Sequence, residues 1–201
     1  MEGIIHIAGA MPRMGTTTAA MQLIHFLKRN NYEAAYAEMN TQDYIWGTTQ
    51  VYKECVMDKI PGKVTYSGID LYSKERLSEL VSGGTHYDYL ICDFGNIQSK
   101  TFDMQAFTNC SAMIIVAGDK SNEIFYTESA LKHKALDNAI YVFNFIQRSD
   151  EADILAMMQD KAKRTAFMPY MPDPYIEIEN DDVNKCYYTV MNNVVELTGG
   201  I

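Results

Sequence analysis

Residues 4–18, Ile-Ile-His-Ile-Ala-Gly-Ala-Met-Pro-Arg-Met-Gly-Thr-Thr-Thr, join an apolar stretch to a glycine-containing turn and the start of a helical pattern. Phosphate-binding loops have this layout, because backbone N–H groups of the turn and of the helix N-terminus hold phosphate oxygens. The residues expected to contact such a ligand are Gly9, Arg13, Gly15, Thr16, Thr17 and Thr18, with the Thr17 hydroxyl placed as a Mg²⁺ ligand. Two alternatives stay open: an ordinary strand-to-helix turn, and a solvated loop arginine at Arg13.

Composition narrows the class of protein. The chain has 201 residues, 47% of them apolar and 21% charged, which is typical of one globular domain with a full-sized core. Its net charge of −9 argues against nucleic acid or anionic lipid as a partner, since phosphate-rich ligands select clustered Lys and Arg.

No apolar run approaches the ~20 residues needed to cross a bilayer, and no signal peptide is expected. With four cysteines and no C-x-x-C pair, a reducing cytoplasm is the expected setting.

Short apolar runs alternate with helix-length segments along the whole chain. Continuously apolar strands that alternate with helices indicate a mostly parallel sheet covered on both faces. We therefore predict a single doubly wound α/β domain over residues 1–201. The expected strands are 4–8, 33–39, 63–66, 87–93, 112–117, 139–145 and 165–168. The expected helices are 18–30, 44–59 (one helix or two short ones), 74–81 (ended by Gly83-Gly84), 123–134, 151–161 and 183–197 (ended by Gly199-Gly200).

Polar side chains lie at the carboxyl ends of three of these predicted strands. In open parallel sheets ligands bind beyond the carboxyl ends of the strands, so we expect Glu38, Asp93 and Asn144 to gather beside the glycine turn. Asp93 is a candidate ligand of Mg²⁺, Glu38 a candidate for orienting water or supporting the metal, and Asn144 a candidate for the edge of a base. The alternatives are an Asp-x-Gly turn at Asp93, an exposed strand-end acid at Glu38, and an Asn144 bonded to neighbouring backbone.

Taken in order, these segments resemble the MinD/ParA family, the deviant Walker A ATPases among the P-loop NTPases. Residues 11–18, Met-Pro-Arg-Met-Gly-Thr-Thr-Thr, lie over that family's K-G-G-x-G-K-T-T loop without a gap. Residues 38–42, Glu-Met-Asn-Thr-Gln, stand where the family has D-x-D-P-Q, and residues 87–93, Tyr-Asp-Tyr-Leu-Ile-Cys-Asp, resemble its Walker B strand. Residues 113–116 resemble a V-V-x-x-P strand, residues 141–144 a strand whose Asn meets adenine, and residues 167–170 an I-P strand near the base.

The resemblance implies a site for ATP or ADP with Mg²⁺. It assigns the phosphates to Gly15 and Thr16, the metal and water to Thr17, Asp93 and Glu38, and the base to Asn144, with Pro169 close to it. Both signature lysines of the family are replaced, by Met11 and Thr16. Loss of these cations weakens phosphoryl transfer, so we expect weak or absent hydrolysis.

Three functions follow as hypotheses. The first is a nucleotide-binding switch that pairs with itself or with an intact family member, and the second is a pseudo-ATPase interaction module without nucleotide. The third is an enzyme of another class that binds a different anion in the same crevice. The family's membrane-targeting helix is basic and amphipathic, whereas this chain ends Val194-Val195-Glu196-Leu197 before Thr-Gly-Gly-Ile, so no direct membrane binding is expected.

Overall fold

The computed structural model describes residues 1–59, 61–82 and 86–199. In these residues one nine-stranded sheet has the order β3-β4-β5-β2-β6-β1-β7-β8-β9. The strands from β5 to β9 in that order pair in parallel, and only the β3-β4-β5 end is antiparallel. The predicted mostly parallel α/β sheet is therefore confirmed. The strands are β1 (Gly3–Gly9), β2 (Ala34–Glu38), β3 (Val56–Met57), β4 (Lys63–Tyr66), β5 (Ile69–Ser73), β6 (Tyr89–Asn96), β7 (Ala112–Ala117), β8 (Ile140–Asn144) and β9 (Thr165–Met168).

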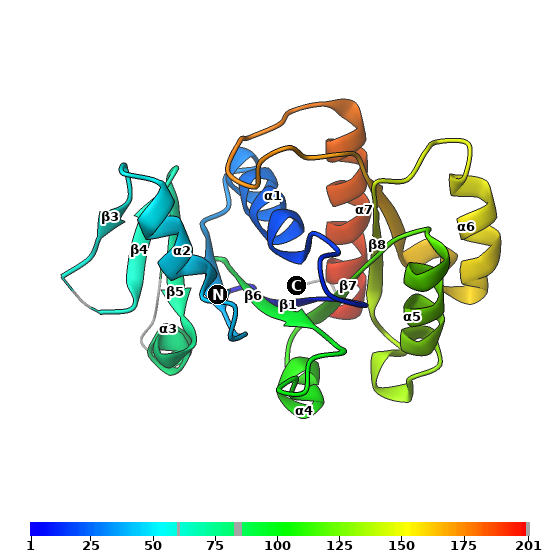
Figure 1. Ribbon diagram of the computed structural model, residues 1–201, viewed down its shortest axis with the longest axis horizontal. Coiled ribbons are helices and arrows are strands. Elements are labelled where there is room, and N and C mark those ends of the chain that lie inside the picture. The colour runs from blue at the N-terminus through cyan, green and yellow to red at the C-terminus, as the bar shows by residue number, and fades with distance from the viewer. Residues whose placement is uncertain (60, 83–85, 200–201) are drawn as a thin grey trace.

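Helices cover both faces of the sheet, because alternate residues of each buried strand point to opposite sides. One apolar core lies under α1 and α7, and a second lies under α3 to α6. Figure 1 shows α1 and α4 on opposite sides of the central strands. The helices are α1 (Thr16–Arg29), α2 (Tyr44–Val51), α3 (Leu77–Ser82), α4 (Met104–Thr108), α5 (Ser121–Leu131), α6 (Glu151–Met158) and α7 (Asp181–Leu197), with short 3-10 turns η1 (Lys74–Arg76), η2 (Lys134–Leu136) and η3 (Gln159–Arg164). Among the described helices, none is both long and apolar enough to span a bilayer.

The antiparallel end of the sheet differs most from the sequence-based prediction. One helix or two short ones were expected over 44–59; the observed helix ends at Val51, and residues 56–57 form a short edge strand on β4. Residues 69–73 form β5, which the apolar pattern did not reveal because it alternates with polar residues in a tight hairpin with β4. The short helix α4 was also missed. The expected stop at Gly83-Gly84 and residue 200 lie outside the described residues.

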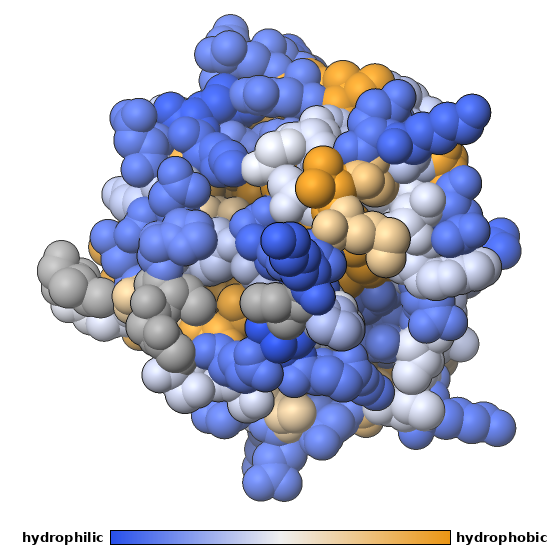
Figure 2. Space-filling model, turned by 90° about the vertical axis from the view of Figure 1, so that its left-hand side faces the viewer, coloured by the Kyte–Doolittle hydropathy of each residue, from blue (hydrophilic) through white to orange (hydrophobic). Residues whose placement is uncertain are grey.

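Exposed apolar side chains occur at this end of the molecule. Val56 and Met57 of β3 and Trp46 of α2 are all more than 60% exposed. Figure 2 views the molecule from this side, and it shows a largely hydrophilic face on which apolar residues form separate patches. Such scattered exposure is normal for a globular surface.

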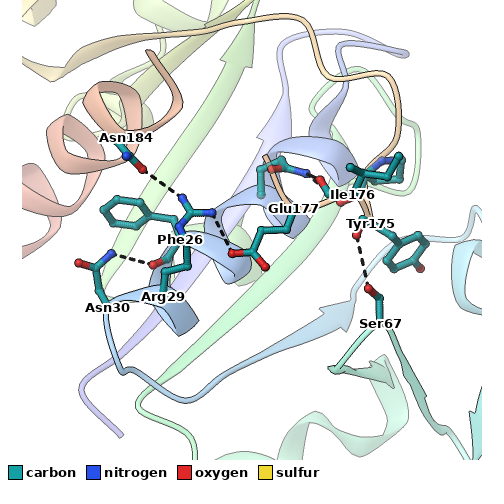
Figure 3. Close-up of polar contacts among 10 residues, drawn as sticks. Phe26, Arg29, Asn30, Ser67, Tyr175, Ile176, Glu177 and Asn184 are labelled. Carbon is teal, nitrogen blue, oxygen red and sulfur yellow. Dashed lines mark hydrogen bonds and ion pairs between the residues drawn. The ribbon is translucent and has the colours of Figure 1, made fainter. Parts of the chain in front are cut away.

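The connection between β9 and α7, residues 169–180, crosses over α1 (Figure 3). Arg29 on α1 pairs with Glu177 at 3.2 Å and bonds Asn184 of α7 at 3.1 Å. Two backbone carbonyls of the connection, those of Pro174 and Ile176, accept from the Gln22 amide at 3.1 and 2.8 Å. We call residues 169–180 the strap, because it ties the C-terminal helix to the helix that follows the glycine turn.

Candidate functional site

The turn between β1 and α1 closes tightly and leaves the start of the helix open. A Cβ at Gly9 would lie 2.8 Å from both the Met11 carbonyl oxygen and the Thr16 hydroxyl, so only glycine fits there. Gly15 is left-handed, with φ 78°, and no side chain caps α1. An uncapped first turn keeps its backbone N–H groups free for an anion.

A cavity of about 340 Å³ lies in front of this turn. Among the described residues that line it, Arg13 is the only charged one; the others are Pro12, Met14, Gly15, Thr16, Thr17, Thr18, Gln42, Gly95 and Asn96. Arg13 is exposed, with φ 65°, and makes no hydrogen bond or ion pair within the described part of the chain. The structure thus brings Arg13 and residues 15–18 of the predicted loop, but not Gly9, to the lining of a cavity that carries little positive charge.

Asp93 lies at the floor of the site and is completely buried. Its Oδ2 accepts from the Thr17 hydroxyl at 2.7 Å and from the Tyr36 hydroxyl at 3.0 Å, and its Oδ1 accepts from the Gly95 N–H at 2.8 Å. Burial raises the pKa of the Asp93 carboxyl, while the hydrogen bonds from Thr17, Gly95, Tyr36 and Asn40 oppose the rise. Each of these donors favours the ionised form of the carboxyl.

The Thr17–Asp93 pair fits a Mg²⁺ ion chemically. The Thr17 proton is directed at Asp93, so the lone pairs of the hydroxyl oxygen remain available to a hard cation. Asp93 itself is screened from solvent and would act on such an ion through Thr17. No group of three or more acidic, histidine or cysteine side chains suited to a metal occurs in the described residues, so ligand phosphates and water would have to supply the remaining coordination.

Glu38 lies beside Asp93 across the β2–β6 pairing, but its carboxylate is directed at α2. Oε1 accepts from the Tyr44 N–H at 2.6 Å and Oε2 from the Ile45 N–H at 3.2 Å. The pKa of Glu38 is raised by burial, and the two backbone N–H groups oppose this. In this structure Glu38 therefore caps a helix, and a role toward water or metal remains a prediction.

Asn144, at the end of β8, holds the glycine turn from below. Its Nδ2 donates to the Met14 carbonyl oxygen at 2.6 Å, and a Cβ at Gly15 would lie 2.8 Å from the same nitrogen. The amide oxygen of Asn144 has no partner among the described residues. Asn144 is 3% exposed, so its observed contact is with backbone, one of the two alternatives open from the sequence.

The residues in place of the two lysines contribute no charge to the site. Met11 packs partly against the core, and its sulfur accepts from the Asn122 amide at 3.7 Å. Thr16 is 8% exposed. Met14 is buried and fills space inside the turn. Apolar packing of Met11 and Met14 therefore supports the loop, and no lysine side chain enters it.

Pro169 does not line the cavity at the glycine turn. It lines a second cavity of about 420 Å³ along the open edge of β9, together with residues that follow β8, such as Ile146 and Arg148. The sequence interpretation placed Pro169 near a base, and the structure leaves that placement untested.

Sequence reasoning missed Tyr36. This tyrosine is completely buried in β2 and donates to Asp93. The available signal was one hydroxyl-bearing residue inside the small apolar run Ala34-Ala35-Tyr36-Ala37. Asn40 was also missed as a partner: its amide donates to the Asp93 backbone oxygen at 3.0 Å.

No protein-family model matches the chain, and no curated protein sequence matches it. By structure it is similar to the MinD cell division protein of Aquifex aeolicus, with a TM-score of 0.66, 16% identity and coverage of 98% of this chain and 97% of that one. The cell division ATPase MinD of Pyrococcus furiosus gives a TM-score of 0.64, 15% identity and coverage of 98% and 100%. A putative plasmid partition protein of Borrelia burgdorferi, bound to AMPPNP, gives 0.63, 13% and coverage of 96% and 98%.

These identities are low, so the likeness concerns the fold. It extends over nearly the full length of this chain and of each of those proteins. The chain therefore has the fold of the MinD and ParA ATPases.

Proposed function

We propose that this protein binds ATP or ADP with Mg²⁺ at the turn between β1 and α1, with weak or no hydrolysis. The observation that carries the proposal is the Thr17–Asp93 hydrogen bond of 2.7 Å beside an uncapped helix start and a 340 Å³ cavity. Phosphate oxygens would meet the free N–H groups of α1, and Thr17 would hold the metal. When bound, Mg²⁺ would neutralise part of the phosphate charge.

Weak catalysis follows from the charges at the site. Phosphoryl transfer depends on cations that stabilise the equatorial oxygens, and removing one such group lowers the rate by roughly 10³-fold or more. Here the exposed Arg13 is the one charged residue in the described lining. Glu38 is occupied by the N–H groups of α2. The residues of the site therefore favour nucleotide binding over nucleotide hydrolysis.

Calorimetric titration with Mg-ATP and Mg-ADP tests the proposal. We expect saturable binding by the wild type and by Thr17→Ser, which keeps the hydroxyl, and loss of Mg²⁺-dependent binding by Thr17→Ala. Thr49→Ala, on α2, is the matched control and should bind as the wild type does. Absence of heat and of any thermal shift with millimolar Mg-ATP would refute nucleotide binding, because a ligand at ~100 times its Kd stabilises by about 2.7 kcal/mol.

A second candidate is an interaction module that holds no nucleotide. The observation in its favour is that both Asp93 oxygens are already satisfied by protein donors. Under this alternative the domain would pair with a second protein, such as an intact member of the same fold class. Binding to that partner with and without Mg-ATP separates the two candidates, since only a nucleotide switch changes its affinity.

The proposed switch acts through protein partners, as a homodimer or with an intact relative. Light scattering of the purified chain with and without Mg-ATP measures this: a nucleotide-dependent increase in mass is expected. Anionic vesicles are not expected to sediment the protein, because the last turn of α7 contains no basic residue. Sedimentation with such vesicles would contradict that part of the proposal.

A further inference from the structure

The sheet ends at β9, and the outer edge of this strand has no neighbouring strand among the described residues. β9 pairs only with β8, in parallel. Along a strand, alternate residues direct their backbone N–H and C=O groups to opposite sides, so about half of these groups in β9 face away from β8. Such unpaired groups can pair with another extended segment.

A groove along this edge restricts what can reach it. The 420 Å³ cavity described above is lined by Ala166 and Phe167 of β9, by Leu155 of α6 and by Cys186 and Thr189 of α7. Figure 1 shows α6 at the end of the molecule opposite β3. Because α6 and α7 flank the free edge and Ala166 is only 3% exposed, the edge admits a narrow segment that enters between the two helices.

Most polar side chains of the groove are bonded within the protein. The hydroxyls of Thr165 and Thr189 each donate to a carbonyl oxygen four residues earlier in the chain, at 3.0 and 2.9 Å. Arg148 pairs with Asp182 at 2.7 Å. The backbone edge of β9 therefore remains the main source of hydrogen bonds for an occupant. Main-chain hydrogen bonding of this kind is typical of an extended peptide that adds a strand to a sheet.

The charge of the groove differs from that of the whole chain. Three basic side chains, Arg148, Lys163 and Lys185, and two acidic ones, Glu151 and Asp182, line it. Arg148 is paired, whereas neither lysine ammonium forms a hydrogen bond or ion pair within the described part of the chain. On a protein with a net charge of −9, two unpaired lysines beside a free strand edge favour an acidic segment.

We propose that the free edge of β9 is the docking site for an acidic, extended segment of a partner protein, which pairs its main chain with β9 and places carboxylates near Lys163 and Lys185. The four residues of β9 span about 13 Å, so a short segment suffices. This inference goes beyond the nucleotide site and does not rest on it.

Two-dimensional NMR of the isotopically labelled full chain, without nucleotide, tests the proposal with three short synthetic peptides. The first alternates valine with glutamate, the second has lysine in place of each glutamate, and the third is the first with every backbone amide N-methylated. We expect the acidic peptide to shift the amide signals of β9 in a saturable way. The lysine peptide and the N-methylated peptide should bind much more weakly, because one lacks the charge and the other lacks the main-chain donors.

Charge reversal in the groove gives a second readout. The double variant Lys163→Glu with Lys185→Glu should raise the Kd of the acidic peptide by roughly 5- to 10-fold, because each exposed ion pair contributes up to about 1 kcal/mol and reversal adds repulsion. Lys53→Glu, at an exposed lysine between α2 and β3, is the matched control and should leave the Kd unchanged.

The proposal would be overturned by any of three results: no saturable shift with millimolar acidic peptide, equal binding of the N-methylated peptide, or an unchanged Kd in the double variant. Light scattering that shows a dimer of the free chain, with β9 amide signals that change on dilution, would assign this edge to a second copy and also overturn it. None of these results affects the nucleotide titration, so the nucleotide proposal stands or fails separately.

Discussion

Two buried tyrosines offer a direct test of how Asp93 is held. Tyr36 and Tyr141 are both completely buried. The Tyr36 hydroxyl donates to Asp93 at 3.0 Å, whereas the Tyr141 hydroxyl has no partner among the described residues. Replacing each tyrosine by phenylalanine removes a buried hydroxyl oxygen. At Tyr36 that hydroxyl is hydrogen-bonded to a carboxyl group, and at Tyr141 it is not hydrogen-bonded within the described residues.

Tyr36→Phe should destabilise the protein by about 1.5–3 kcal/mol near neutral pH, the range for a hydrogen bond to a charged group. Tyr141→Phe should be neutral or stabilising, since it removes a buried hydroxyl that makes no hydrogen bond. The difference between the two variants corresponds to at least a tenfold change in the folding equilibrium. Urea denaturation followed by far-ultraviolet circular dichroism measures both free energies of unfolding.

The pH dependence of this effect has a defined sign. Burial raises the folded-state pKa of Asp93 above its unfolded value, and the Tyr36 hydroxyl favours the ionised form. Removing that hydroxyl raises the folded pKa further, so the loss of stability is complete above both folded pKa values. It shrinks as pH falls through them and the carboxyl becomes protonated in both proteins.

Denaturation of wild type and Tyr36→Phe over a series of pH values therefore completes the test. We expect the difference in free energy of unfolding between the two proteins to grow as pH rises. A cost that is equal at every pH, or a Tyr141→Phe variant as unstable as Tyr36→Phe, would refute the assignment of Tyr36 as a donor to an ionised Asp93.

Three further changes probe the supports of the site. Gly15→Ala should lower stability by about 1–2 kcal/mol or more, because Gly15 is left-handed and a Cβ would lie 2.8 Å from the Asn144 amide; a melting temperature unchanged from wild type would contradict this. Glu38→Ala should cost about 1–3 kcal/mol by leaving two N–H groups of α2 without their acceptor, and Glu38→Gln should cost less; equal losses in denaturation would argue against capping. Gln22→Ala releases two carbonyls of the strap, so limited proteolysis within residues 169–180 should become faster, and an unchanged cleavage rate would show that other contacts hold the strap.

The central fold was predictable because its strands are buried on both faces. Such strands read as continuous apolar runs, and β1, β7 and β9 occur within a residue of their expected bounds. The antiparallel end was not predictable in the same way. Its strands are short and partly exposed, and β5 alternates in polarity, so local pattern does not separate them from turns or helix.

The candidate site was predictable in outline and not in its contacts. That the glycine turn, Glu38, Asp93 and Asn144 would gather follows from the rule that parallel strands end at one edge. Which atom each carboxylate accepts from does not follow, because that depends on side chains from strands far apart in sequence. Tyr36, for example, reaches Asp93 across a sequence separation of 57 residues.

The sequence by itself determined the alternating strand and helix order, the glycine turn after the first strand, and the absence of both lysines from that turn. These features depend on residue type and spacing along the chain, which sequence records directly. Only the tertiary structure decided that Glu38 caps α2, that Asn144 holds the turn through the Met14 carbonyl, and that α6 and α7 flank the free edge of β9. Those contacts join segments that are brought together by sheet pairing and strap packing, so they exist only once the chain is folded.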